Sequence, residues 1–318
     1  MCWEIRHKLK AMALLHCFEV TKTVTIAQRP NTPLRACMCR KNGHPFFSIV
    51  ALTISLPFAL LSAYAEAIHD AVAVGDVAQV SALLARNPAL IHAEDRAART
   101  PLLLAAEKGQ GAVVEYLLGH GANINEKNTQ GFAPIHAAIA AKQTAVLRQL
   151  LARGADTKVT VFDGANLLSW AAASDFPEGV DLLITSGIPV NAADELGITP
   201  LELAAEKGHV EVVKRLLAHN ANVNLADKSG FSPLLGAVKQ GNDEIVTELL
   251  ARHANLQQKD VGGFTALHLA AYNGRARIAR LLIARGADVT ATDENGKTPC
   301  RVAQERDETE TASLLCNQ

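Results

Sequence analysis

The sequence predicts an all-α solenoid built from one repeated helix–turn–helix unit, and two observations predict it. A Thr-Pro-Leu start, or a variant of it, occurs seven times at intervals of 33 residues between Thr100 and Thr298, and a fixed period of this length is typical of a solenoid. Aromatic residues make up only 4% of the 318 residues, although apolar residues make up 49%. A core of small aliphatic side chains favours closely packed helices over a β-sandwich.

Residues 1–65 differ in composition from the rest of the chain. They hold eight of the 31 Lys and Arg residues, two of the 32 acids and four of the six Cys. The stretch from Phe46 to Ala65 has no charged residue and ends in the small-x-small motif Ala63-Tyr64-Ala65. A basic segment, an apolar run and such a motif are typical of a secretory signal peptide.

We therefore predict a signal peptide at 38–65, starting at Met38, with cleavage after Ala65 and export to the periplasm or the medium. Residues 1–37 are interpreted as an over-long start or a cytoplasmic extension. The alternative is an uncleaved membrane anchor at 46–65, because about 20 apolar residues are long enough to span a bilayer. In that case this segment would provide the membrane contact.

The charge of the remaining chain argues against one class of partner. Residues 66–318 keep 23 bases and 30 acids, so their formal net charge is −7, whereas the whole chain carries −1. Nucleic-acid binding needs a basic surface. We predict no nucleic-acid partner, and the acidic balance mildly favours a basic protein partner.

The first helix of each unit has recognisable start and stop residues, which the unit at Thr199 illustrates. Thr199 is expected to cap the helix, and Pro200 fits its first turn, where a missing N–H costs nothing. Ala204 and Ala205 let neighbouring helices approach closely. Gly208 suits the turn between the helices, because glycine adopts a left-handed backbone at no steric cost.

The second helix carries the core stripe and leads to a hairpin. Leu216 and Leu217 form this stripe in the same unit, and glycine ends the second helix in several others. A further glycine column marks a hairpin turn before the next unit; its members are Gly131, Gly164, Gly197, Gly230, Gly263 and Gly296.

The fullest copies read TPLELAAEKGHVEVVKRLLAHNANVN from Thr199 and TALHLAAYNGRARIARLLIARGADVT from Thr265. This pattern resembles the ankyrin repeat family over residues 66–318. The resemblance implies an ankyrin repeat solenoid of about eight stacked units of 33 residues, each a helix–turn–helix plus a β-hairpin, with atypical end units as caps. It also implies a monomeric protein-binding scaffold.

Residues 133–190 are the least regular part of the repeat. Asn166 replaces the usual start, and Lys142 and Asp175 stand where most units have the turn glycine. The segment is either locally softer or shaped for a partner, and the sequence does not separate the two.

No enzyme, cofactor or metal site is predicted, because no catalytic or metal-ligating motif is present. His136 and His268 occupy a repeat column in which the family uses His as a structural hydrogen bonder. An enzyme would need a convergent polar cluster near Trp170, and the sequence shows none. Cys300 and Cys316 are interpreted first as small buried hydrophobes, with a disulfide that clasps the C-terminal cap as the alternative.

The candidate partner-binding residues form one apolar series. In ankyrin proteins, contacts lie at the hairpin tips and along the first helix, on the concave side. Carried onto this chain, these positions are Phe132, Phe162, Leu196, Ile198, Phe231, Phe264 and Tyr272. Exposed aromatic anchors suit protein recognition; the alternative is that these side chains merely cover the hairpins.

The sequence therefore predicts a non-enzymatic scaffold that binds a partner protein in the periplasm. Two alternatives share the fold: a secreted effector that binds a host protein, and an immunity or inhibitor protein.

Overall fold

A computed structural model describes residues 65–161 and 164–317. The predicted extension at 1–37 and all of the predicted signal peptide except Ala65 lie outside the described residues. Within the described part of the chain, no helix has both the length and the hydropathy needed to cross a bilayer.

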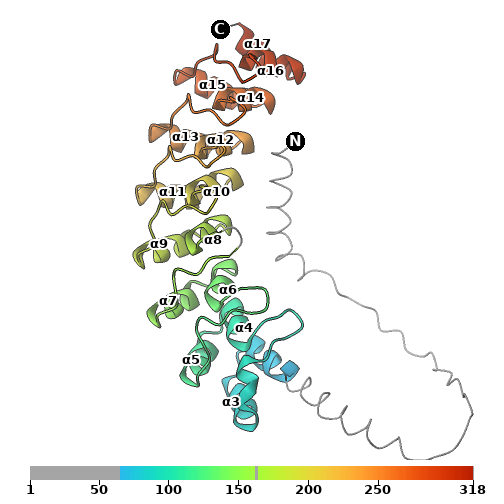
Figure 1. The fold of residues 1–318 in the computed structure, drawn as a ribbon, viewed down its shortest axis with the longest axis vertical. Helices are drawn as coiled ribbons and strands as arrows, with labels where there is room; N and C mark the ends of the chain where they lie inside the picture. The colour runs from blue at the N-terminus through green and yellow to red at the C-terminus, as the bar shows by residue number, and fades with distance from the viewer. Residues whose placement is uncertain (1–64, 162–163, 318) are drawn as a thin grey trace, which may run out of the picture. The chain divides into compact units, whose positions relative to one another are not determined.

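The described residues form successive pairs of short helices (Figure 1). Each pair has a first helix that starts at the Thr-Pro-Leu position or its equivalent and a second helix that follows a short turn. The first helices are residues 65–74, α4 (Pro101–Lys108), α6 (Pro134–Ala140), α8 (Leu167–Ala173), α10 (Pro200–Lys207), α12 (Pro233–Gln240), α14 (Ala266–Tyr272) and α16 (Pro299–Glu305). The second helices are α3 (Val77–Arg86), α5 (Gly111–Gly119), α7 (Thr144–Ala152), α9 (Pro177–Thr185), α11 (Val210–Ala218), α13 (Asp243–Ala251), α15 (Ala276–Ala284) and α17 (Thr309–Cys316). A 3₁₀ turn, η1 (Pro88–His92), follows α3.

The helix pairs stack with equivalent helices in contact. From α4 onward, each first helix contacts the next first helix, and each second helix contacts the next second helix, which makes two helical layers. Each unit therefore buries its apolar face against its neighbours, as a solenoid requires. The prediction of an all-α repeat solenoid is confirmed.

The connections between units differ in detail from the predicted β-hairpins. Among the described residues the one β-bridge joins Val161 and Ala165. Elsewhere the turn closes with two backbone hydrogen bonds, as from Asp227 N–H to Phe231 O and from Gly230 N–H to Asp227 O, both at 2.9 Å. Five residues are too few for a ladder, so these segments are tight turns.

The expected caps are present. Thr199 Oγ1 accepts the Glu202 N–H at 3.2 Å, and Asn166 Oδ1 accepts the Ser169 N–H at 3.0 Å. Ala133 has no side-chain acceptor, and there the first-turn His136 Nδ1 accepts the Ala133 N–H at 3.1 Å. Gly208 has φ of 78°, in the left-handed region that ends a helix without steric cost.

The core consists of the Ala and Leu columns predicted from the repeat. Ala204, Ala205 and Leu216 are fully buried, while Leu217 is 2% exposed. Alanine at the helix contacts leaves no room for rings, which accounts for the low aromatic content.

Candidate partner-binding ridge

An Asp or Asn side chain fixes the turn before most units. In the turn at 260–264, Asp260 Oδ1 accepts the N–H groups of Gly262 and Phe264, both at 2.9 Å. This is an Asx turn, in which the side chain replaces a backbone acceptor. The residues that do this are Asp95, Asn128, Asp194, Asp227, Asp260 and Asp293.

The candidate residues near the C-terminal end lie close together on the surface. Tyr272 is 40% exposed, and its ring centroid lies 6.3 Å from that of the half-buried Phe264 in an edge-to-face contact. The Arg306 guanidinium lies 4.3 Å from the Tyr272 ring centroid. Val261, at the tip of the same turn as Phe264, is 66% exposed. We call Val261, Phe264, Tyr272 and Arg306 the C-terminal ridge.

Two candidate residues do not belong to an exposed ridge. Ile198 is 1% exposed and Phe231 is 5% exposed, so the expectation that they are exposed is wrong. Each directly precedes a buried capping residue, Thr199 or Ser232, and follows an Asx turn. Both side chains are core residues.

The remaining candidates are spread along the stack. Phe132 and Leu196 are half-buried, and Phe162 lies outside the described residues. The Leu196 carbonyl accepts the Lys228 N–H of the next turn at 2.9 Å. The six described positions therefore do not converge, and of these six the structure groups only Phe264 and Tyr272.

Val261 was missed by the sequence reasoning, although a signal for it exists. The same tip position holds Arg96, Thr129, Glu195, Lys228 and Glu294 in the other described turns. Apart from Phe162, every other residue of this column is polar, so a valine there indicates an apolar side chain at the surface. Val74, 75% exposed at the end of the first helix, was also missed.

The two histidines of the repeat column, His136 and His268, lie inside the stack as structural groups. His268 Nδ1 lies 2.8 Å from Thr265 Oγ1, and its Nε2 donates to the Lys297 carbonyl at 3.0 Å. Burial lowers the pKa of His136 to about 4, so its imidazole is neutral at pH 7. Its ring packs edge-to-face with Trp170 at 6.3 Å. His136 is 1% exposed, so a substrate in solution does not reach its imidazole.

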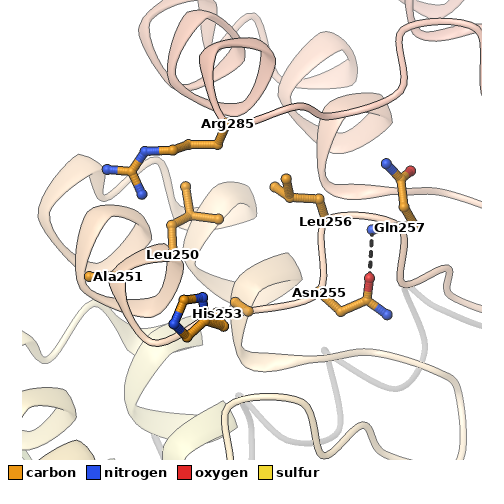
Figure 2. A pocket seen from close by; sticks show the side chains of 8 residues that line it. Leu250, Ala251, His253, Asn255, Leu256, Gln257 and Arg285 are labelled. Atoms are coloured by element: carbon orange, nitrogen blue, oxygen red, sulfur yellow. Dashed lines mark hydrogen bonds between the residues drawn. The ribbon is translucent and has the colours of Figure 1, made fainter.

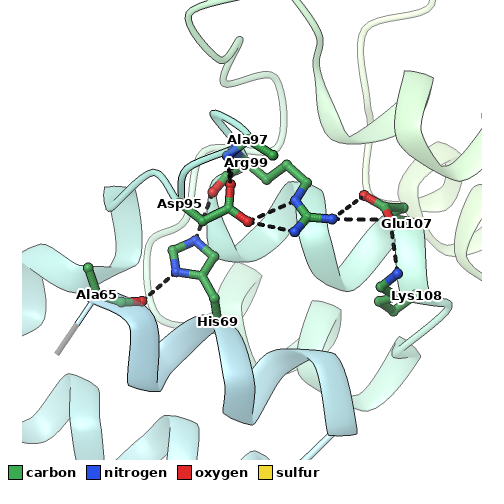
Figure 3. Close-up of polar contacts among 7 residues, drawn as sticks. All are labelled: Ala65, His69, Asp95, Ala97, Arg99, Glu107 and Lys108. Carbon is green, nitrogen blue, oxygen red and sulfur yellow. Dashed lines mark hydrogen bonds and ion pairs between the residues drawn. The ribbon is translucent and has the colours of Figure 1, made fainter. Parts of the chain in front are cut away.

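Charged groups hold the first turn against α4 (Figure 3). Arg99 stands in the column that holds Phe in three other units, and it pairs with Asp95 at 2.7 Å and with Glu107 at 3.1 Å. Burial raises the pKa of Asp95, but the hydrogen bonds and charge of Arg99 outweigh it and hold that pKa below its usual value. His69 contacts the Arg99 carbonyl at 2.7 Å, so this network joins two units.

An open hollow of about 630 Å³ lies at the end of α13 (Figure 2). Leu250 and Leu256 form apolar walls, and Arg285 comes from the next unit. Asn255 Oδ1 accepts the Gln257 N–H at 2.9 Å, so that side chain shapes its own loop. Across the described residues no group of His, Cys, Asp and Glu is arranged to hold a metal ion.

The two cysteines of the last unit are joined. Cys300 and Cys316 form a disulfide with a Cα–Cα distance of 5.1 Å, which ties the start of α16 to the end of α17. Cys316 is exposed and Cys300 is half-buried, so the interpretation as buried hydrophobes is wrong. Among the described residues, the last unit packs on α14 and α15 and has no further unit on its other side.

The comparison with known proteins agrees with this architecture. Three segments of the chain, 68–161, 168–260 and 237–318, match the family described as Ankyrin repeats (3 copies). Together they cover most of the described residues. No curated protein matches the chain. The helix pairs, their caps and this match lead to one conclusion: the chain belongs to the ankyrin repeat family.

Proposed function

We propose a binding function for this chain, because ankyrin repeats in general mediate protein–protein interaction. We propose that this chain is a non-enzymatic scaffold that acts in the periplasm as a monomer and binds a partner protein through its C-terminal ridge. The observation that carries the proposal is the contact between Phe264 and Tyr272, with Val261 66% exposed beside them. Exposed apolar groups beside an aromatic ring are typical anchors of a protein interface.

Arg306 adds a directional contact to this ridge. Its guanidinium lies over the Tyr272 ring, and this position fixes the ring without covering its outer edge, because Tyr272 stays 40% exposed. An ordered aromatic side chain loses less entropy on binding. The acidic balance of residues 66–318 favours a partner with basic groups around an apolar centre.

The periplasmic location rests on two observations. One is the signal-peptide pattern of residues 38–65. The other is the disulfide between Cys300 and Cys316, because disulfides persist in oxidising compartments and are rare in the cytosol. Cell fractionation and N-terminal sequencing of the exported chain test this part, and a mature start far from Glu66 contradicts it.

The binding part is tested by affinity capture followed by mass spectrometry. The double variant Phe264→Glu/Tyr272→Glu should lose a partner that the unchanged chain retains. Arg148→Glu, an exposed charge change on α7, is the matched control and should retain it. Equal capture by all three proteins refutes the ridge, provided that their helical circular dichroism is the same.

A further inference from the structure

The turn at 161–165 lacks the side chain that fixes the other described turns. Val161 occupies the column of Asp194 and Asp260, and a valine side chain has no hydrogen-bond acceptor. Between the described residues of this turn there is one backbone hydrogen bond, from Val161 N–H to Ala165 O at 3.1 Å. The turn therefore lacks the two side-chain hydrogen bonds that the Asp carboxylate or Asn amide accepts in each Asx turn.

The helices on both sides of this turn bury polar atoms without partners. His136 and Ser169 occupy the same column of α6 and α8, and each is 1% exposed. Neither His136 Nε2 nor Ser169 Oγ has a hydrogen-bond partner among the described residues. Two other units fill this column with Leu103 and Leu235, which need no partner, and the unit of α10 has the buried Glu202 there. An unpaired buried polar group destabilises the packing around it.

Two regular units show what His136 lacks. His268 Nε2 donates to the Lys297 carbonyl, 29 residues further along the chain, at 3.0 Å. His69 Nε2 likewise contacts the Arg99 carbonyl at 2.7 Å. Each bond ties a first helix to the start of the next unit. The equivalent partner of His136 is the Ala165 carbonyl, and that tie is missing.

The helix–helix turns of these two units are strained as well. Lys142 has φ of 55° and Asp175 has φ of 52°, whereas glycine occupies the same place in five other units: Gly75, Gly109, Gly208, Gly241 and Gly274. A residue with a Cβ pays a steric cost in the left-handed region. Three kinds of weak contact therefore meet in the same two units.

We propose that the stack has a built-in opening point between α6 and α9, where the helix pairs α6–α7 and α8–α9 separate and repack while the units on either side stay folded. The neighbouring units keep the regular side-chain hydrogen bonds, which are the Asx turns of Asn128 and Asp194 and the helix caps of Thr100 and Thr199. Opening at one such point lets two ordered arrays of helix pairs change their mutual angle. This is a local unfolding equilibrium of the kind that separates cooperative units within one protein.

Native-state hydrogen exchange with mass spectrometry on the full chain at pH 7 tests the proposal. Amides of α6–α9 should exchange at least tenfold faster than those of α10–α13. Protection that is uniform along the stack, or lowest in α10–α13, overturns it.

Matched substitutions in the Asx column test the cause. Val161→Asp should slow the exchange of α6–α9 at least tenfold, and Asp260→Val should create a second fast region around α12–α15. Because an Asp at the buried Val161 position can prevent folding, Ser169→Ala is the second variant and should also slow exchange. Opening that is unchanged in both Asp260→Val and Ser169→Ala contradicts the proposal.

Discussion

The disulfide between Cys300 and Cys316 makes the stability of the last unit depend on its redox state. The bond closes a segment with a sequence separation of 16, from the first turn of α16 to the last turn of α17. Thr311 is 1% exposed and Leu315 is 4% exposed, and these two residues are the buried contacts of α17. Without the bond, α17 is held mainly by those two side chains.

The size of the effect follows from the length of the closed segment. In the chain-entropy account, cross-linking a loop of this length stabilises by about 3 kcal/mol. Since a tenfold change in an equilibrium constant is about 1.4 kcal/mol, reduction should make opening of α17 on the order of 100-fold more frequent. The effect should stay within the last unit, because solenoid stability is a sum of neighbour contacts.

Hydrogen exchange of α17, with and without a thiol reductant, measures this change. The oxidised chain should protect the amides of residues 309–316, and reductant should remove that protection without affecting α10–α13. The double variant Cys300→Ala/Cys316→Ala is the control: it should resemble the reduced chain and not respond to reductant. If reductant leaves the protection of α17 unchanged, or if the variant matches the oxidised chain, the reasoning is refuted.

Three other predictions concern the stack itself. First, burial lowers the pKa of His136 to about 4 from an unfolded value near 6.5, so the fold favours the neutral imidazole. The free energy of unfolding should therefore be highest above pH 6.5 and fall by up to about 3 kcal/mol as the pH drops toward 4. Urea unfolding at pH 6.5 and pH 4 should show a smaller pH dependence for His136→Leu than for the unchanged chain. Second, Lys142→Gly should stabilise the folded chain by about 0.5–1 kcal/mol and raise its melting temperature, because glycine removes the steric cost of the left-handed backbone. The exposed ion pair between Lys142 and Asp175 contributes little, and a lower melting temperature would show that this pair matters more than the backbone conformation. Third, Phe231→Ala should cost about 3–5 kcal/mol whereas Tyr272→Ala costs less than about 1 kcal/mol, measured by thermal unfolding, and similar losses would contradict their assignment to core and surface.

The helical framework is largely readable from sequence because each unit repeats the same local chemistry. Thr-Pro starts, alanine pairs and turn glycines act over a few residues, so their positions in the sequence place α4, α10 and α12 correctly. The departures at Asn166 and Asp175 were also visible, and the structure shows what each does: Asn166 caps α8, and Asp175 holds φ of 52° without glycine.

The surface was less predictable, because exposure depends on contacts between units. Phe231 and Phe264 occupy the same column, yet Phe231 is 5% exposed whereas Phe264 is half-buried beside Tyr272. The role of Val161 could have been found by comparing the Asx column, since valine is the one residue there without an acceptor.

The central claim is that the C-terminal ridge binds a protein. Isothermal titration of a captured partner against the unchanged chain and against Phe264→Glu/Tyr272→Glu tests it most directly. The account predicts at least a tenfold weaker Kd for the double variant, with unchanged helical circular dichroism and no loss in Arg148→Glu. Equal affinity of the double variant and the unchanged chain would contradict it.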